Sequence, residues 1–329
     1  MAELRTQARF PEVADARGHY ESFYLRACHP SEPVGVWIRY TVLKRPGAKP
    51  RGSLWFTLFD ASAAEGPAAR KVTLEPGEVG VESGSYIHIG DARFDPHAVA
   101  GSALDASWNL TYDSPEPSQR HLPSEWMYRA PIPKTKLLSP HPAARFSGEV
   151  KVGERSVQLD GWRGMVGHNW GAQHAERWIW AHGIDFEGAD DAWLDIALGR
   201  IRLGPLTTPW IGNGALSLDG ERHSLGGPAA ARGTEVSDRP DGCDFLLPGK
   251  GIAVRGRVTA APGQIVAWVY SDPDGGEHNT LNCSISRMEL TVERSGGEPR
   301  RLVSAHGAAY EIGVRETDHG VALQPYPDP

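Results

Sequence analysis

Short segments of alternating side chains, each ended by turn residues, recur along this chain and limit the folds open to it. In residues 34–44, VGVWIRYTVLK, every second position is apolar, as in a β-strand with one buried face. The pattern returns at residues 53–60, 69–75, 84–94 and 102–113, each bounded by Gly, Pro, Ser or Asp. Helical periodicity does not separate these segments. The sequence therefore predicts an all-β protein with antiparallel strands, of sandwich or barrel type.

Proline breaks this rhythm in the middle of the chain. Seven Pro fall in residues 114–142, and Pro lacks the amide hydrogen that a central strand donates. We interpret this stretch as an extended Pro-rich crossover with a domain boundary at residue 140. The strand pattern resumes from residue 144 and continues to residue 316. We therefore expect two barrel-like units, at residues 1–140 and 141–329.

Local sequence signals predict three turns and one segment that is not a regular strand. Turn chemistry is clear at Gly153-Glu154, at Asp219-Gly220 and in residues 272–278, DPDGGEH. Residues 15–27, DARGHYESFYLRA, lack clean alternation, and we interpret them as a short helix or an irregular arm.

Charge and composition exclude several classes of protein. The net charge of −7 argues against nucleic acid as a partner, because phosphate binding needs an excess of Lys and Arg on one face. The three Cys are far apart, which suggests neither a disulfide framework nor a zinc knuckle. The charged start of the chain and the absence of a long apolar window predict neither a signal peptide nor a transmembrane segment. We expect a cytoplasmic location.

Residues 161–183, GWRGMVGHNWGAQHAERWIWAHG, hold four of the eleven Trp and three of the thirteen His. Such a cluster fills a core or lines a cavity for an apolar ligand. Alternation in residues 177–183 places Trp178, Trp180 and His182 on one face. A pocket wall and a packed core both agree with that pattern.

The HNWG box at residues 168–171, followed by a Trp-rich strand and an Asp-bearing strand, resembles the AttH/CrtC group of tandem lipocalin-like proteins. That group includes carotenoid 1,2-hydratases (hydroxyneurosporene synthases) and is related to tocopherol cyclases and lipocalin-like Diels–Alderases. The resemblance is closest over residues 144–200. It implies two tandem lipocalin-like (calycin) barrels or half-barrels packed together, with the box in the second unit.

The resemblance also implies site residues. The His-x-Trp pair of the hydratases matches His168 and Trp170, and their Tyr-x-Asp pair matches Trp193 and Asp195, with Trp in the Tyr position. Other members often carry Asp at the position of Gly167. Both departures bear on which substrate the site accepts.

Alkene hydration or cyclisation begins with proton delivery to carbon. Asp195 stands between Leu194 and Ile196, and an apolar wall would raise its pKa and keep it protonated as a general acid. We expect His168 to hold Asp195 or to deprotonate water, and Trp170 and Trp193 to stabilise a carbocation. The alternatives are that Asp195 points outward at a strand edge and that Trp170 only packs the closed end of a barrel.

Substrate-binding residues are predicted around this set. They are Trp178, Trp180, His182, His174, Glu176, Asn169 and Tyr310. The spacing of His168, His174 and His182 matches no common zinc pattern, so we predict neither a metal nor an organic cofactor.

Three functions remain open. The first is a cofactor-independent lyase or isomerase that hydrates, dehydrates or cyclises a hydrophobic isoprenoid, terpenoid or polyketide-like substrate in an apolar barrel cavity. The second is a non-catalytic carrier of a hydrophobic small molecule. The third treats the Trp cluster as inter-domain core alone. A hydrophobic small molecule is the expected partner, and a homodimer is compatible with the sequence.

Overall fold

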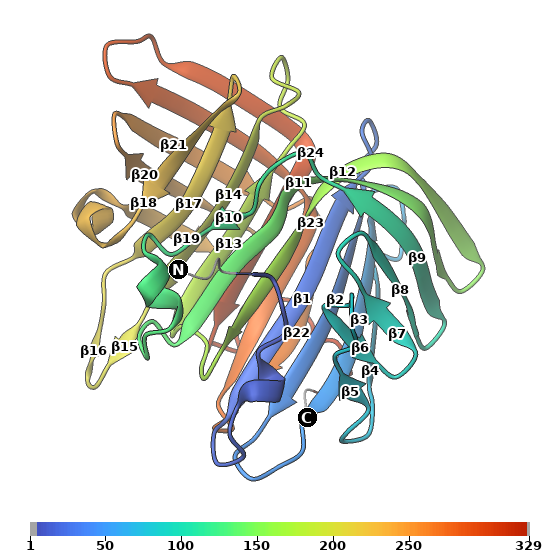
Figure 1. Ribbon diagram of the computed structural model, residues 1–329. Helices are drawn as coiled ribbons and strands as arrows, with labels where there is room; N and C mark the ends of the chain where they lie inside the picture. Colours follow the sequence, from blue (N-terminus) through green and yellow to red (C-terminus); the bar gives the residue numbers. More distant parts are fainter. Residues whose placement is uncertain (1–4, 328–329) are drawn as a thin grey trace.

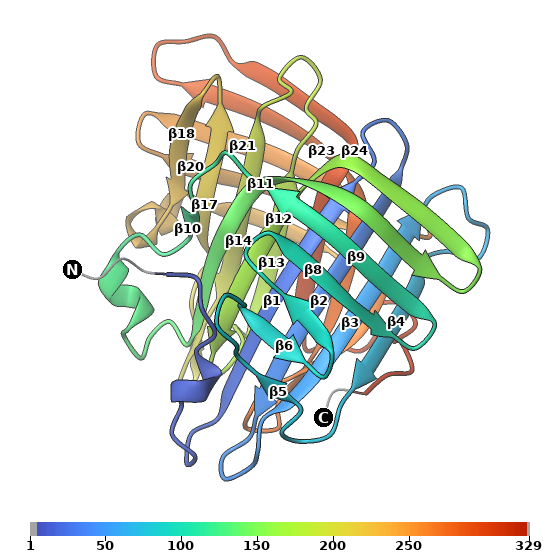
Figure 2. The same ribbon diagram turned by 45° about the vertical axis from the view of Figure 1, so that its right-hand side comes forward.

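The computed structural model describes residues 5–327 and consists of two large antiparallel sheets (Figure 1). The first has the strand order β4-β3-β2-β1-β12-β11-β9-β8-β7-β6-β5, with β10 paired to β11. It curls into a half-barrel (Figure 2). Its strands are β1 (His19–Cys28), β2 (Val34–Lys44), β3 (Arg51–Asp60), β4 (Ala68–Thr73), β5 (Val79–Gly80), β6 (Ile87–Ile89), β7 (Ala92–Phe94), β8 (Ala98–Ala103), β9 (Ala106–Asp113), β10 (Gln119–Arg120), β11 (Thr135–Val152) and β12 (Arg155–Gly171).

The second sheet closes on itself. Its order is β18-β17-β14-β13-β24-β23-β21-β20-β19, and Leu225 of β18 also pairs with Gly249 of β20, which joins eight strands into a barrel. Strand β22 pairs with β23. The strands are β13 (Arg177–Gly183), β14 (Trp193–Arg200), β17 (Ile211–Leu218), β18 (Glu221–Gly226), β19 (Glu235–Arg239), β20 (Gly242–Gly249), β21 (Ile252–Thr259), β22 (Val266–Ser271), β23 (Glu277–Arg294) and β24 (Arg300–Val314).

The remaining elements are short. Strands β15 (Arg202–Leu203) and β16 (Leu206–Thr207) form a separate hairpin, and η1 (Phe10–Glu12), η2 (Glu125–Tyr128) and η3 (Pro228–Gly233) are single 3-10 turns. None of the helices in residues 5–327 is long and apolar enough to cross a membrane. A closed barrel beside a curled half-barrel confirms the predicted all-β, tandem lipocalin-like architecture.

The sheets divide the chain later than the sequence suggested. Residue 140 lies inside β11, and both β11 and β12 belong to the first sheet, so the chain changes sheet between Gly171 and Arg177. The HNWG box is therefore the end of the first sheet. Pro140 and Pro142 are accommodated because the pairing of β11 with β12 shifts register on either side of His141. The Pro-rich crossover proper is the irregular stretch before Thr135.

Alternation within the strands sorts side chains into three layers. In β1, Phe23 and Leu25 point into the core of the half-barrel, and Tyr24 points to the opposite face. In β13, Ile179 and Ala181 point into the core of the closed barrel. The two outward faces meet, because β1, β2 and β3 pack against β23, and β11 packs against β14.

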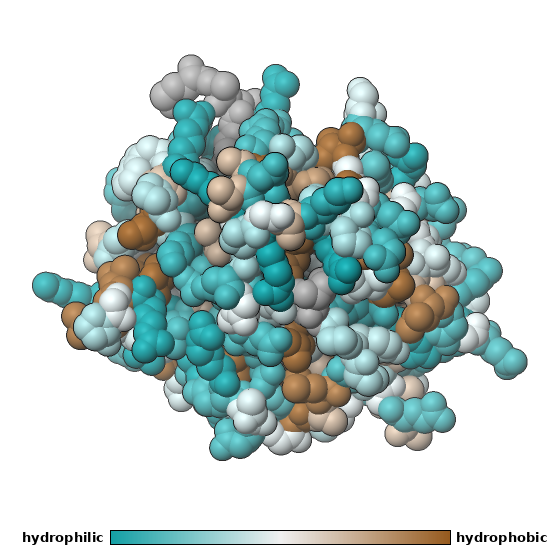
Figure 3. Space-filling view, turned by 90° about the horizontal axis from the view of Figure 1, so that it is seen from below, coloured by the Kyte–Doolittle hydropathy of each residue, from teal (hydrophilic) through white to brown (hydrophobic). Residues whose placement is uncertain are grey.

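This middle layer is rich in aromatic and polar groups. Trp37, Trp55 and Trp268 lie there, almost completely buried. The face of the molecule seen from below is largely hydrophilic, with small separate hydrophobic patches (Figure 3). The space between the sheets thus holds a cluster of large buried aromatic side chains.

Candidate functional site

A cavity of about 930 Å³ lies between the two sheets. Tyr24, Arg39 and Asn169 line it from the first sheet. The second sheet contributes Trp178, Trp180 and Glu311, and the Pro-rich crossover contributes His121. The interior of the closed barrel is instead filled by packed apolar side chains. The cavity expected inside a barrel is therefore found outside it.

Apolar side chains mark the open side of this cavity. Trp126, Ile132 and Leu203 line it, and they remain 66%, 55% and 50% exposed. Large exposed apolar groups are costly in water unless they meet a ligand or a partner. An entrance of this kind suits a hydrophobic molecule.

Asp195 lies behind the cavity wall, fully buried, on the face of β14 opposite Leu194 and Ile196. Its carboxylate accepts hydrogen bonds from Ser139 Oγ at 2.5 Å and Trp180 Nε1 at 3.1 Å, and it pairs with His121 Nε2 at 3.1 Å. Ser139 lies on β11, Trp180 on β13 and Asp195 on β14; β13 pairs with β14, and β11 of the other sheet packs against β14 (Figure 1).

The pKa of Asp195 is shifted in the direction opposite to the one expected from the sequence. Burial alone would raise the pKa of Asp195, but the charge of His121 and the hydrogen bonds from His121 and Ser139 outweigh it and bring the pKa down to about 2. The prediction of a raised pKa is wrong because only the apolar neighbours in sequence were visible. The carboxylate is ionised at neutral pH.

His121 was missed by the sequence reasoning and occupies the position between Asp195 and the cavity. Its Nε2 faces the carboxylate, and its Nδ1 lies 3.5 Å from the carbonyl oxygen of Asn213. Both ring nitrogens thus lie near oxygen atoms, and these contacts fix the orientation of the ring. The residue stands alone in an irregular, Pro-rich stretch, so no periodic pattern marked it.

His168 does not pair with Asp195, contrary to the sequence-based expectation. Its Nε2 lies 2.7 Å from Glu21 Oε1, and its ring stacks on Phe23 and on Trp170 with centroids 4.0 and 4.5 Å apart. The two-residue period of β12 places His168 and Trp170 on the half-barrel face and Asn169 on the cavity face.

Glu21 is the second buried carboxylate with a His partner. Besides His168, it accepts hydrogen bonds from the backbone amides of Arg9 and Phe10. Burial opposes ionisation, yet the hydrogen bonds from His168 and His19 lower the pKa of Glu21 to about 2. Glu21 therefore fastens the N-terminal arm to the half-barrel.

Trp170 lines a different hollow, of about 940 Å³, beside the N-terminal arm. The guanidinium of Arg9 lies 5.3 Å from its ring centroid, and Lys136 and Lys134 line the same hollow. So many cationic groups would repel a carbocation, and the role predicted for Trp170 does not fit this position.

Three further predicted residues lie away from the cavity: Trp193, Tyr310 and His182. Trp193 is fully buried against Ile184 and Ala215. The hydroxyl of Tyr310, inside the closed barrel, donates to the carbonyl of Arg239 at 2.6 Å.

His182 is held as a neutral ring. Its Nδ1 accepts from Arg26 Nη1 at 3.0 Å, so its Nε2 carries the proton and donates to the Pro142 carbonyl at 2.9 Å. Burial, with the charge of Arg26, lowers the pKa of His182 to about 3. Through these contacts His182, on β13 of the second sheet, is hydrogen-bonded to β1 and β11 of the first sheet, and it does not line the cavity.

Five predicted substrate-binding residues do line the cavity together. They are Asn169, His174, Glu176, Trp178 and Trp180.

Two charged residues that the sequence analysis did not single out, Glu311 and Arg39, also line the cavity. Glu311 accepts from Trp178 Nε1 at 3.2 Å and from the Tyr270 hydroxyl at 3.3 Å. Arg39 stacks 3.9 Å above the Tyr270 ring and donates to Ser22 at 2.7 Å.

The structure explains the Gly at position 167. A Cβ there would lie 2.1 Å from Cζ of Tyr24, whose ring packs edge-on against Trp180 at 5.4 Å. Tyr24 fills the space that an Asp side chain would need. A side chain at this position, such as the Asp of the hydratase pattern, would therefore clash with Tyr24.

Comparisons with known proteins agree with this architecture. No family model matches the chain. Crystal structures of a protein assigned as AttH from Nitrosomonas europaea, of kievitone hydratase from Nectria haematococca and of CghA with Sch210972 superpose with TM-scores of 0.57, 0.53 and 0.56. The chain shares the fold of these proteins. The sequence identities are 12%, 10% and 14%, and the matches cover 95%, 92% and 90% of this chain and 96%, 90% and 88% of the others.

The chain also has sequence relatives in Mycobacterium tuberculosis. Two uncharacterised proteins, from strains H37Rv and CDC 1551, are each 25% identical to this chain in an alignment of 322 residues. The alignment covers 94% of this chain and 91% of theirs. The resemblance to AttH and to the hydratases is confirmed at the level of the fold.

Proposed function

We propose that the protein is a cofactor-independent lyase or isomerase that hydrates, dehydrates or cyclises a hydrophobic isoprenoid, terpenoid or polyketide-like molecule in the inter-sheet cavity. The observation that carries the proposal is the buried His121–Asp195 pair at the wall of an aromatic cavity. A buried carboxylate–imidazole pair beside a cavity is the arrangement that general acid–base chemistry uses.

Proton transfer is assigned to His121. Ionised Asp195, fixed by Ser139 and Trp180, stabilises the imidazolium of His121 and sets its orientation. The imidazolium delivers a proton to the substrate, and the neutral ring then removes one from water or from a neighbouring carbon. Because an imidazolium is a weaker acid than a protonated carboxyl, the double bond must be activated by conjugation or by an oxygen substituent.

The cavity wall suits a molecule with an apolar body and a polar end. Trp178 and Trp180 offer aromatic faces, each contributing about 0.5–2 kcal/mol if positive charge develops over it. Arg39 and Glu311 can hold an oxygenated end of the substrate. Kievitone hydratase and CghA, which have this fold, support a small-molecule substrate for this chain.

A non-catalytic carrier is the second candidate. It is favoured by one observation, namely that three donors already occupy the Asp195 carboxylate, as they would around a purely structural acid. The same cavity would then bind a hydrophobic ligand without changing it.

Solvent isotopes separate the two candidates even while the substrate is unidentified. The protein is incubated with a panel of isoprenoids, terpenoids and polyketides in deuterated or ¹⁸O-labelled water, and products are resolved by liquid chromatography and mass spectrometry. An enzyme of this kind transfers solvent hydrogen or oxygen to one class of compound. Asp195→Asn should reduce that rate at least about 100-fold, and ligand quenching of Trp fluorescence should persist.

The matched control is Asp113→Asn, which removes an exposed carboxylate on β9. It should keep the wild-type rate. A panel compound that binds tightly but takes up no label would leave the carrier as the better description. An Asp195→Asn variant with full activity would instead refute the role given to the His121–Asp195 pair.

A further inference from the structure

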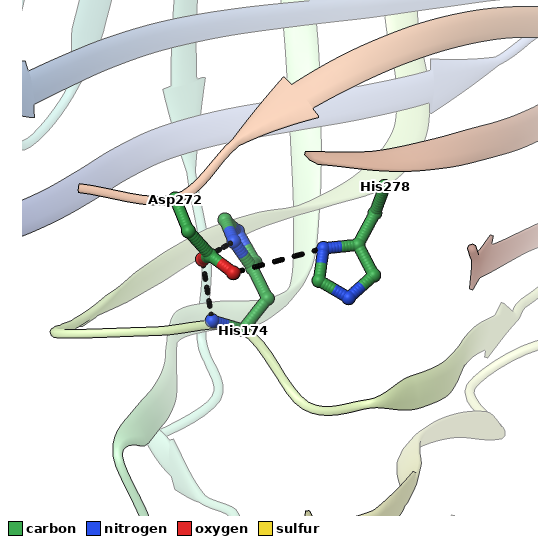
Figure 4. Close-up of side chains that lie close together, drawn as sticks. All are labelled: His174, Asp272 and His278. Carbon is green, nitrogen blue, oxygen red and sulfur yellow. Dashed lines mark hydrogen bonds and ion pairs between the residues drawn. The ribbon is translucent and has the colours of Figure 1, made fainter. Parts of the chain in front are cut away.

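Three metal-ligating side chains from distant parts of the chain meet at one edge of the cavity (Figure 4). His174 lies in the link between β12 and β13, Asp272 directly follows β22, and His278 is the second residue of β23. One ligand atom from each lies within 4.8 Å of the other two. His174 Nδ1 is 2.7 Å from Asp272 Oδ1, and His278 Nδ1 is 3.8 Å from Asp272 Oδ2.

Several polar atoms of this cluster are buried without a hydrogen bond to any described residue. They are Asp272 Oδ2, His174 Nε2 and one ring nitrogen of His278, whose imidazole otherwise interacts with the backbone of Ala175. Buried polar atoms without partners cost about 1–3 kcal/mol each, so native proteins rarely leave several together. A cation held between the three side chains would give a partner to Asp272 Oδ2 and to one ring nitrogen of His278.

The side chains are held in place from several sides. Tyr20 stacks on the His174 ring with centroids 3.9 Å apart, and Trp178 stacks on it at 5.2 Å and meets His278 edge-on at 5.0 Å. The backbone amide of His174 donates to Asp272 Oδ1 at 2.7 Å. Rings and carboxylate fixed in this way are preorganised for a shared ligand.

We propose that His174, Asp272 and His278 bind one divalent first-row transition-metal ion, of which Zn²⁺ is the representative. Two imidazoles and one carboxylate form the donor set that such ions prefer, whereas Mg²⁺ and Ca²⁺ prefer oxygen alone. Tetrahedral ligands of Zn²⁺ lie about 3.3 Å apart, so His278 must move by about 1 Å to complete the site. Binding displaces the proton shared by His174 and Asp272.

Charge around the cluster does not oppose the ion strongly. Arg315 is the nearby cation that acts on His278, and its guanidinium is engaged by Glu176 Oε2 at 3.1 Å and by the Glu277 carbonyl at 3.3 Å. Asp272 supplies a negative charge inside the cluster. Three protein ligands leave further coordination positions for water or for an oxygen of a ligand.

The location gives the ion a role in shaping the cavity. His174 lines the cavity, and the link that carries it follows the last strand of the first sheet. Asp272 and His278 belong to the second sheet. A metal would therefore fix the link between β12 and β13 against the second sheet at the cavity wall, independently of proton transfer at His121 and Asp195.

Metal titration of the untagged protein tests this inference. After treatment with a chelator and dialysis, wild-type protein should bind one Zn²⁺ per chain in isothermal titration calorimetry, and Co²⁺ should give visible absorption bands of a nitrogen- and oxygen-ligated ion. His278→Ala and Asp272→Asn should each weaken binding at least about 100-fold, more than the loss of a group that only supports a ligand.

His88→Ala is the matched control, because this half-buried His lies on β6 in the other sheet. It should bind Zn²⁺ as wild type does, and so should Asp195→Asn. Circular dichroism verifies that each variant folds, and His174→Ala replaces any that does not. Wild-type protein that binds no stoichiometric Zn²⁺, or binding that survives in His278→Ala and Asp272→Asn, overturns the proposal.

Discussion

Asp195→Asn should change how the stability of this protein depends on pH. The carboxyl is fully buried, and its pKa falls from a usual value near 3.8 to about 2 in the fold, because the charge and hydrogen bonds of His121 and the hydrogen bond of Ser139 outweigh the opposing effect of burial. A shift of this size corresponds to about 2–3 kcal/mol of stabilisation at neutral pH, at about 1.4 kcal/mol per pKa unit.

The sign follows from the direction of the shift. A carboxyl with a lowered pKa in the folded state stabilises the fold above the pKa of the unfolded chain, and this contribution disappears as the pH falls through the folded value. About two thirds of the stabilisation should be lost between pH 7 and pH 2.5. The amide in the Asp195→Asn variant cannot titrate, so the gap in unfolding free energy between wild type and variant should shrink by about 1.5–2 kcal/mol over that range.

Urea denaturation at a series of pH values, followed by Trp fluorescence, measures this gap. Glu21 also has a lowered pKa, but it is present in both proteins, so its contribution cancels in the difference. A gap that stays constant with pH, or that widens as the pH falls, would refute the account of Asp195 as an ionised partner of His121.

Four other substitutions test the remaining parts of the structure. Glu21→Ala should destabilise the fold by about 3–5 kcal/mol in urea denaturation, because it removes the carboxylate from a buried pair. Trp178→Ala should cost less than about 2 kcal/mol, since its ring faces a cavity, while Trp193→Ala should cost about 3–5 kcal/mol as a core truncation. Gly167→Ala should push Tyr24 into the cavity, lowering stability by about 1–3 kcal/mol and weakening ligand binding measured by Trp quenching.

One control variant and two contradicting outcomes accompany these predictions. The exposed Glu75→Ala should leave stability within about 0.5 kcal/mol of wild type. Equal costs for Trp178→Ala and Trp193→Ala would mean that the cavity wall packs as tightly as the core. A Gly167→Ala variant with unchanged stability and ligand binding would show that Tyr24 can move aside freely.

Local sequence patterns predicted much of the fold. The segment at residues 34–44 is β2, and the turn at Asp219-Gly220 separates β17 from β18, with both residues at positive φ of 57° and 76°. Strand alternation and turn chemistry depend on neighbours one to three positions away, so the sequence expresses them directly. Trp178 and Trp180 were assigned to one face correctly for the same reason.

The failures occurred where tertiary packing overrides local pattern. Residues 15–27, read as a short helix or an arm, form most of β1, whose residues are all buried. A strand covered on both faces has no need to alternate polar and apolar residues. Likewise, Pro140 and Pro142 were taken to exclude a strand, although irregular pairing admits them.

The sequence by itself determined an all-β chain, its turns, its tandem lipocalin-like resemblance and the strand that presents two Trp side chains to a common face. Only the tertiary structure decided which polar groups meet. His121 lies 74 residues from Asp195, Glu21 lies 147 from His168, and His174 lies 98 from Asp272. Such partners are chosen by how two sheets pack, and nothing in the local spacing of a residue encodes which side chain will face it across that interface.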